Sequence, residues 1–316
     1  MAFEPPERLV RALGETYGDA LAGPWLDRLP ELAEESAARR GLAVDRVQAP
    51  GGRSSLVALV RRPDGTPAAL KVAPSFARPD LERAALAHWH GWGAAQLLDE
   101  ETSGEAGDDA LLLERLHPEV SLRSLPEAKA LLEAAGTVRR LWVEPPAGHA
   151  FETVAERTER QSGPMRASRD PELAPLVSAA LAARDELAAA SPELLLLHGN
   201  FRQSKVLSGE RAPWLTVGPE PLVGERAYDL ARLVRDRVED LIAAPSGASA
   251  ARRRVNKLAD SLDVDPVRLH GWTLFRAVES GLRGGVAGRH QDAELRQPGT
   301  GGGTARSAAA RHGAPS

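Results

Sequence analysis

The pattern of apolar and polar positions divides the chain into a strand-containing first third and a helical remainder. Residues 6–41 carry apolar side chains at helical spacing and predict two helices, broken at Gly23–Trp25. Over 44–74 the period shortens and predicts three short strands, with a tight hairpin turn at Pro63–Thr66. A helix over about 79–89 follows. The first third is therefore expected to form a small sheet with helices beside it.

The remaining two thirds predict mostly helices. The run SPELLLLHGNF predicts a short buried strand, and KVLSG with PWLTVG predicts a small hairpin. From about Gly288 onward, Gly, Ala, Arg and Ser without apolar periodicity predict a disordered tail. We expect an N-terminal part over 1–116, a helical part over 117–287 and the tail over 288–316. The predicted helices cover 126–142, 150–161, 171–190, 227–243, 249–262 and 266 to about 286.

This order of elements favours an α+β protein of two lobes, a small β-rich lobe followed by a larger helical one. The 316 residues are 42% hydrophobic and 27% charged, which allows a packed core and excludes wholesale disorder. Cysteine is absent, which removes disulfides, thiolate metal sites and cysteine nucleophiles and fits a reducing, cytoplasmic location.

The charge balance favours a small-molecule ligand. The formal net charge of −4 gives no basic field for nucleic acid. The N-terminus lacks the pattern of a signal peptide, and no apolar run has the length of a membrane span. A cleft between two lobes is the usual place for a small ligand. The oligomeric state does not follow from the sequence.

Lysine is rare in this arginine-rich chain, so each lysine is informative. Of 40 cationic residues only Lys71, Lys129, Lys205 and Lys257 are lysines. Lys71 lies in an apolar strand after the hairpin, where its side chain either snorkels to the surface or enters a cleft to meet an anion. Glu82, on the following helix, is placed to pair with it.

A longer stretch resembles a known family. LLLLHGNFRQSKVLSGERAPWLTVGPEPLVGERAYDLARLVRDR is similar to the aminoglycoside phosphotransferases, in particular the streptomycin 6-kinase and hydroxyurea phosphotransferase branch. RRPDGTPAALKV, ERAALAHWHGWGAAQLLDEE, LLLERLHPEVSL and RLHGWTLFRAVES also resemble that branch. The resemblance spans about Val44 to Glu279 and implies a protein-kinase-like fold with a β-rich N-lobe and a helical C-lobe.

The resemblance implies positions for the nucleotide. Lys71 would hold the α- and β-phosphates, with Glu82 as its partner. The hinge whose backbone meets adenine would lie in LLLERL, at Leu113 and Glu114.

The resemblance also implies two supporting residues beside the loop. His198 would be structural and bond the loop backbone. Asp229 would brace the same loop.

Three positions of the catalytic loop depart from the family pattern. The family reads HGDxHxxN and then IDP, whereas this chain has Asn200, Lys205 and Gly218 at the base and the two metal positions. An amide cannot accept the substrate proton, and loss of a general base costs about 10²–10⁴-fold in rate. Glycine offers no side-chain oxygen to Mg²⁺, and an ammonium repels it. These changes predict that Mg²⁺-dependent phosphotransfer is lost, with no metal and no cofactor.

We weigh three functions from the sequence. The first is a repurposed enzyme, in which Asn200, Arg202 and Lys205 carry a metal- and ATP-independent isomerisation or cyclisation in specialised metabolism. The second is a non-catalytic pseudokinase that binds a metabolite, a nucleotide or a partner protein. The third is an active ATP-dependent antibiotic phosphotransferase with a rearranged metal site that uses Glu220 or Glu225. The sequence ranks them in this order and leaves open whether the protein is an enzyme.

Overall fold

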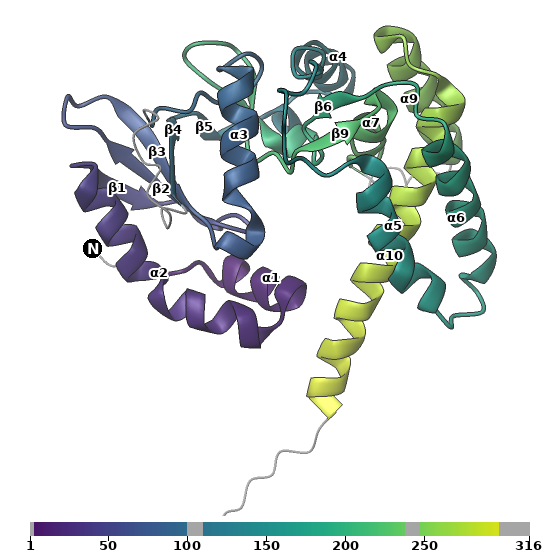
Figure 1. The fold of residues 1–316 in the computed structure, drawn as a ribbon, viewed down its shortest axis with the longest axis horizontal. Helices are drawn as coiled ribbons and strands as arrows, with labels where there is room; N and C mark the ends of the chain where they lie inside the picture. The colour runs from purple at the N-terminus through teal and green to yellow at the C-terminus, as the bar shows by residue number, and fades with distance from the viewer. Residues whose placement is uncertain (1–2, 100–109, 238–246, 297–316) are drawn as a thin grey trace, which may run out of the picture.

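A computed structural model describes residues 3–99, 110–237 and 247–296. Figure 1 shows a sheet with helices α1–α3 in one half of the molecule and mainly helices in the other half. This is the α+β, two-lobe, kinase-like architecture that the sequence predicts. No helix within the described ranges is long and apolar enough to cross a membrane.

The N-lobe sheet is antiparallel with strands in sequence order. The predicted hairpin turn is confirmed, and the Asp64 carboxylate accepts a hydrogen bond from the Thr66 amide at 2.9 Å. The strands are β1 (Ala43–Val47), β2 (Leu56–Arg61), β3 (Pro67–Val72) and β4 (Ala110–Glu114). The order places β3, which carries Lys71, between two neighbours, so its side chains lie away from the sheet edges.

Two helices precede the sheet, but the break between them differs from the prediction. Helix α1 covers Glu7–Tyr17 and α2 covers Asp19–Arg39. The chain turns at Gly18, whose φ of 80° is accessible to glycine because it has no Cβ. The predicted break at Gly23–Trp25 is wrong, since α2 continues through two prolines.

The N-lobe core forms where these helices pack on the sheet. Leu9, Leu13 and Leu29 from α1 and α2 are fully buried in one cluster with Leu56 and Leu70 from the strands. Burial of such side chains contributes about 1.5–3 kcal/mol each. Helix α3 covers Pro79–Trp89, as predicted, and is preceded by the short 3₁₀ helix η1 (Ser75–Ala77).

The C-lobe helices match the predicted regions, although the helix predicted over 126–142 ends at 138 and the one predicted over 150–161 runs from 154 to 167. Two differences are larger. Helix α7 ends at Val234, earlier than predicted, because the chain turns through Arg237 at a φ of 54°. Residues 238–243 of the predicted helix lie outside the described residues. The helices are α4 (Glu127–Val138), α5 (Val154–Ala167), α6 (Ala174–Ala189), α7 (Arg226–Val234), α9 (Gly247–Leu262) and α10 (Pro266–Arg296).

The second difference concerns the predicted tail. Helix α10 continues to Arg296, past the expected start of disorder at Gly288. The segment after Gly288 lacks apolar periodicity but is rich in good helix formers, which extend an existing helix. Residues 297–316 lie outside the described residues.

Short strands in the C-lobe hold the central loops. The predicted strand is β6 (Leu195–Leu197), and the predicted hairpin is β7 (Val206–Ser208) with β8 (Leu215–Thr216). Two further strands, too short for a periodic signal, complete small sheets with them. These are β5 (His117–Ser121), which pairs with β7, and β9 (Leu222–Gly224), which pairs with β6; η2 (Leu122–Ser124) and η3 (Gln203–Lys205) flank them.

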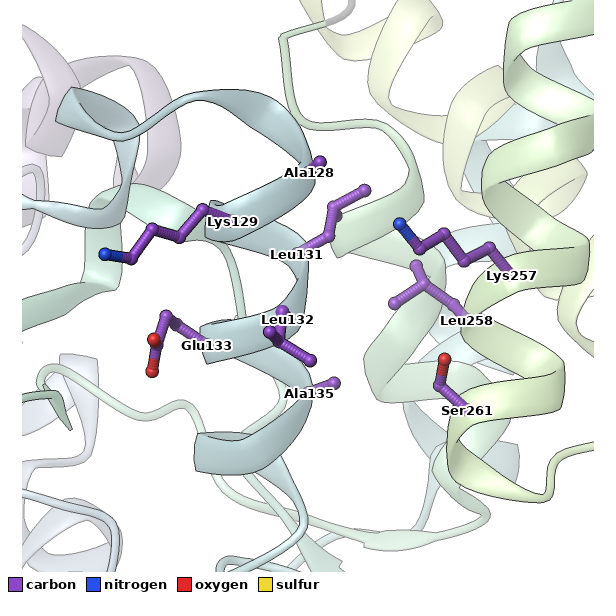
Figure 2. A pocket seen from close by; sticks show the side chains of 9 residues that line it. All are labelled: Ala128, Lys129, Leu131, Leu132, Glu133, Ala135, Lys257, Leu258 and Ser261. Carbon is purple, nitrogen blue, oxygen red and sulfur yellow. The ribbon is translucent and has the colours of Figure 1, made fainter.

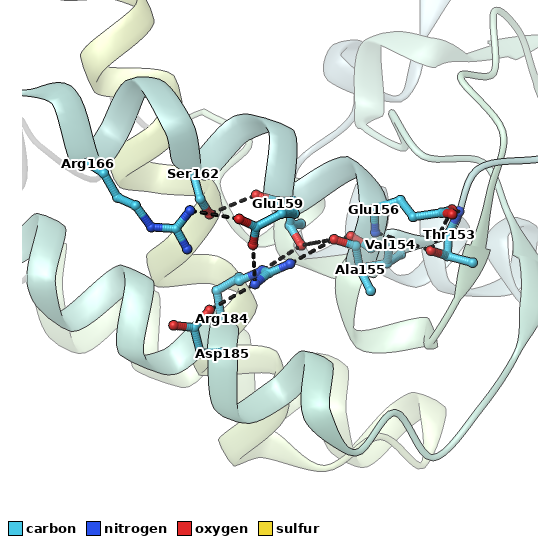
Figure 3. A network of polar contacts seen from close by, with 10 residues as sticks. Thr153, Val154, Ala155, Glu156, Glu159, Ser162, Arg166, Arg184 and Asp185 are labelled. Carbon is cyan, nitrogen blue, oxygen red and sulfur yellow. Dashed lines mark hydrogen bonds and ion pairs between the residues drawn. The ribbon is translucent and has the colours of Figure 1, made fainter.

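A polar network fixes α5 to α6 in the C-lobe (Figure 3). Thr153 and Glu156 form a capping box at the start of α5. Arg184 of α6 forms an ion pair with Glu159 at 2.7 Å and donates to the Ala155 carbonyl at 2.8 Å. Because Thr153 also forms a β-bridge with Val223 of β9, the network connects α5 and α6 to the small sheet of β6 and β9.

Candidate active site

Lys71 and Glu82 form a buried ion pair between the sheet and α3. Lys71 lies on β3 and Glu82 on the first turn of α3, and both residues are less than a tenth exposed. The predicted pairing is confirmed. A buried lysine needs such a partner, because an isolated charge is costly away from water.

The segment predicted as the hinge, Leu113 and Glu114, ends the last strand of the N-lobe sheet. Leu113 is buried on β4 opposite Ala69, and the Glu114 amide donates to the Gln96 carbonyl at 2.9 Å. The Glu114 carboxylate receives two hydrogen bonds from Arg211 of the β7–β8 hairpin, at 2.8 and 3.1 Å. The sequence did not predict this contact with Arg211. The contact gives the Glu114 side chain a structural role, because it holds the end of β4 to the β7–β8 hairpin.

Asp229 braces the loop that follows β6. Its buried carboxylate accepts hydrogen bonds from the backbone amides of His198 at 2.9 Å and Gly199 at 2.8 Å. Burial raises the pKa of Asp229, while the two amides and Arg276 favour its charged form. The geometry agrees with the bracing role implied by the family resemblance.

His198 supports the same loop from inside. Its ring is fully buried, and Nδ1 accepts a hydrogen bond from the Asn200 amide at 3.3 Å. Burial, with the nearby charge of Lys205, lowers the pKa of His198 to about 3. The imidazole is therefore neutral at physiological pH and acts on the backbone, as the resemblance implies.

Arg276 is a further support that sequence reasoning missed. It lies on α10, donates to the Gly199 carbonyl at 3.1 Å and stacks over the ring of Tyr228 at 4.4 Å. The residue lies 77 positions from Gly199. No local sequence signal connects the two.

Asn200 is brought against Glu220. The Asn200 side-chain amide donates to Glu220 Oε1 at 2.7 Å, and the Glu220 backbone amide donates to the His198 carbonyl at 2.9 Å. Gly199, with a φ of 74°, permits this approach, since a Cβ there would lie 1.8 Å from the Glu220 carbonyl oxygen. The loop is therefore shaped to place a carboxylate beside Asn200.

Lys205 occupies the space next to Gly218. Its Nζ lies 3.5 Å from the Gly218 carbonyl oxygen. Burial lowers the pKa of Lys205 to about 8, and repulsion from Lys71 and Arg202 acts in the same direction. The ammonium therefore titrates near physiological pH and carries a charge below it.

Arg202 completes a group of three cations. Burial lowers its pKa, whereas Asp236 and Glu220 favour its charge. Its Nε is buried without a hydrogen-bond partner among the described residues. Lys205 is near enough to both Lys71 and Arg202 to be repelled by them, so the structure brings these cations into one neighbourhood. Such a cluster suits the phosphates of a nucleotide.

Magnesium fits this site less well than a nucleotide does. The two positions where the family pattern puts metal ligands carry an ammonium, at Lys205, and no side chain, at Gly218. In the parts of the chain that the structure describes, no group of three or more His, Cys, Asp or Glu residues could hold a metal. Glu225 is occupied by Arg268 and by Trp272, at 2.5–2.6 Å. Of the two carboxylates considered from the sequence, Glu220 and Glu225, Glu220 is therefore the one that lies beside the loop without such cationic partners.

A separate groove of about 440 Å³ lies between α4 and α9 (Figure 2). Its lining is mainly leucine and alanine, and Leu132 is 70% exposed. Lys257 extends from α9 toward α4, whereas Lys129 points to the other side of α4. The groove holds none of the candidate site residues.

A sheet lysine paired with a helix glutamate, together with a braced loop in the helical lobe, is the arrangement of a protein-kinase-like fold. The match to known proteins makes this specific. Residues 40–288 match the family described as aminoglycoside/hydroxyurea antibiotic resistance kinase, and the chain belongs to this family.

Similar proteins include named kinases. The chain is 31% identical to streptomycin 6-kinase of Streptomyces glaucescens, over 88% of this chain and 90% of that protein. It is 34% identical to hydroxyurea phosphotransferase of Kitasatospora aureofaciens, over 84% and 76%. Among solved structures, aminoglycoside phosphotransferase APH(4)-Ia with ADP and hygromycin B has a TM-score of 0.55 at 17% identity, covering 83% of this chain and 94% of that one.

These findings correct two expectations. The prediction that phosphotransfer is lost and replaced by an isomerisation or cyclisation in specialised metabolism is wrong, because the matched family and relatives are kinases. The prediction that no cofactor is used is wrong for the same reason, and a structural neighbour holds ADP. Substitution at three loop positions is a local change, and it does not reveal groups that other segments bring to the site.

Proposed function

We propose that the protein is an ATP-dependent phosphotransferase that phosphorylates a hydroxyl group of a small-molecule antibiotic of the aminoglycoside or hydroxyurea kind. The observation that carries this proposal is the buried Lys71–Glu82 ion pair beside Arg202 and Lys205. It supplies fixed positive charge where a kinase-like fold binds nucleotide phosphates.

Each cation has a separate part in this proposal. Lys71, oriented by Glu82, meets the α- and β-phosphates of ATP. Lys205 and Arg202 lie on the catalytic-loop side of the cleft, where charge on the transferred phosphoryl group develops. The acceptor is a polar small molecule in the same cleft. Since ATP is the donor, we place the activity in the cytoplasm.

The direct test is phosphate transfer from γ-labelled ATP to a panel of streptomycin, other aminoglycosides and hydroxyurea, with product identified by mass spectrometry. We expect transfer to at least one acceptor. Lys71→Ala is expected to lower ATP affinity and kcat, whereas Lys257→Ala, on the distant groove, leaves both unchanged. An enzyme that transfers phosphate to no acceptor in the panel and shows no thermal stabilisation by ATP would contradict the proposal.

A further inference from the structure

We infer that Glu220 is the catalytic carboxylate that takes the proton of the acceptor hydroxyl, and that Asn200 is the positioning residue that orients it. The inference rests on the proposed function and assigns its proton acceptor. Three observations support it: the Asn200–Glu220 hydrogen bond, the backbone contacts that hold Glu220 against the loop, and the burial and partners of the other nearby carboxylates.

The backbone around Glu220 is fixed to the catalytic loop. The Glu220 amide donates to the His198 carbonyl, and only a glycine at position 199 permits the observed approach of the two segments. Asn200 itself is 9% exposed, so its amide is held by the packing around it. Glu220, by contrast, is an exposed residue, so its side chain is open to solvent.

The position of the carboxylate matters because the usual base position holds an amide. Asn200 cannot accept a proton, but its Nδ2 donates to Glu220 Oε1 at 2.7 Å. The carboxylate therefore lies one hydrogen bond from the place where the family pattern has its own. A general base must first lie within hydrogen-bond distance of the proton that it takes, and only then does its pKa matter.

The other nearby carboxylates are occupied. Asp229 binds two loop amides, Glu82 pairs with Lys71, and Asp236 accepts from the Gln203 amide at 2.5 Å. Glu225 is bound by Arg268. Glu82 Oε1 also has no partner among the described residues, but Glu82, Asp229 and Glu225 are buried and Asp236 is half-buried. Glu220 is the exposed residue among these carboxylates.

The charges that face Glu220 come from several elements, and most are positive. They are Arg202 on the loop, Lys205 on η3, Arg157 on α5 and Arg232 on α7, with the phenol of Tyr17 from α1.

The step is balanced without a further reactant. The acceptor O–H bond breaks and its proton goes to Glu220 Oε2. The acceptor oxygen forms a bond to the γ-phosphorus of ATP, and the bond from that phosphorus to the bridging oxygen breaks. ADP leaves with the electron pair, and the nearby ammonium of Lys205 offsets the charge that develops.

The test compares Glu220→Gln, which keeps an oxygen for Asn200 but cannot accept the proton, with the exposed control Glu210→Gln. We expect Glu220→Gln to lower kcat about 10²–10⁴-fold, with the KM for ATP nearly unchanged. Asn200→Asp in the Glu220→Gln background is expected to restore activity, because it returns a carboxylate to the loop.

The outcomes separate the two proposals. An active wild type whose Glu220→Gln variant keeps its kcat within twofold overturns the role of Glu220 and leaves the proposed function intact. A wild type without phosphotransfer to any acceptor overturns both. Loss of folding is excluded by equal thermal unfolding of Glu220→Gln and Glu210→Gln, and the Asn200→Asp rescue gives a second readout.

Discussion

The Nζ atom of Lys205 lies 2.4 Å from the place that a Cβ on residue 218 would occupy. Gly218 also has a φ of 60°, a conformation that favours glycine. The Lys205 ammonium therefore lies in space that a side chain at position 218 would enter, and an added Cβ there would displace the flexible end of the lysine. Two substitutions that look unrelated in sequence form one local arrangement.

This dependence predicts a coupling between the two positions. Gly218→Ala is expected to destabilise the protein by about 1–3 kcal/mol, from backbone strain and from displacement of the lysine. Lys205→Ala removes the steric part, so the double variant is expected to lose less stability than the sum of the two single variants. Thermal unfolding of all four proteins in a double-mutant cycle measures this. Strict additivity would show that the two positions are independent.

The charge of Lys205 predicts a pH dependence of nucleotide binding. Its pKa of about 8 means that the ammonium loses its proton as pH rises through 8, well below the usual value for lysine. Affinity for ATP is expected to fall between about pH 7 and 9. Isothermal titration across this range is the measurement, and Lys205→Arg, which stays charged, is expected to give a flatter profile. An identical fall in both proteins would assign the effect to another group.

His198 predicts a different dependence, of stability on acid. Its folded-state pKa of about 3 lies below the unfolded value of 6.5, so between these values the unfolded chain binds a proton that the folded chain does not. The contribution of the neutral His198 ring to the free energy of unfolding is present above pH 6.5 and is lost as pH falls toward 3. Denaturant unfolding from pH 7 to 4 is expected to show a steeper decline for wild type than for His198→Asn. Parallel curves would contradict a buried neutral imidazole.

The sequence predicts much of the site where contacts are local or follow a regular element. Lys71 and Glu82 lie 11 residues apart on a strand and the next helix, and their pairing follows from that order. The Asn200–Glu220 contact does not, because it depends on the backbone conformation at Gly199 and on a second segment 20 residues away. The sequence names Glu220 as a carboxylate near the loop, but it does not show that the Asn200 side chain donates to it.

Arg276 gives the last prediction, because it supports the loop after β6 from α10, 77 residues further along the chain than Gly199. Its guanidinium donates to the carbonyls of Gly199 and Tyr228, both at 3.1 Å, and covers the Tyr228 ring. Arg276→Ala leaves the Gly199 carbonyl without this donor and is expected to lower kcat more than it changes the KM for ATP, since Lys71 is untouched. Steady-state kinetics check this, with Arg283→Ala on the exposed end of the same helix as the control. A change confined to the KM for ATP would place the effect of Arg276 at the nucleotide and not at the loop.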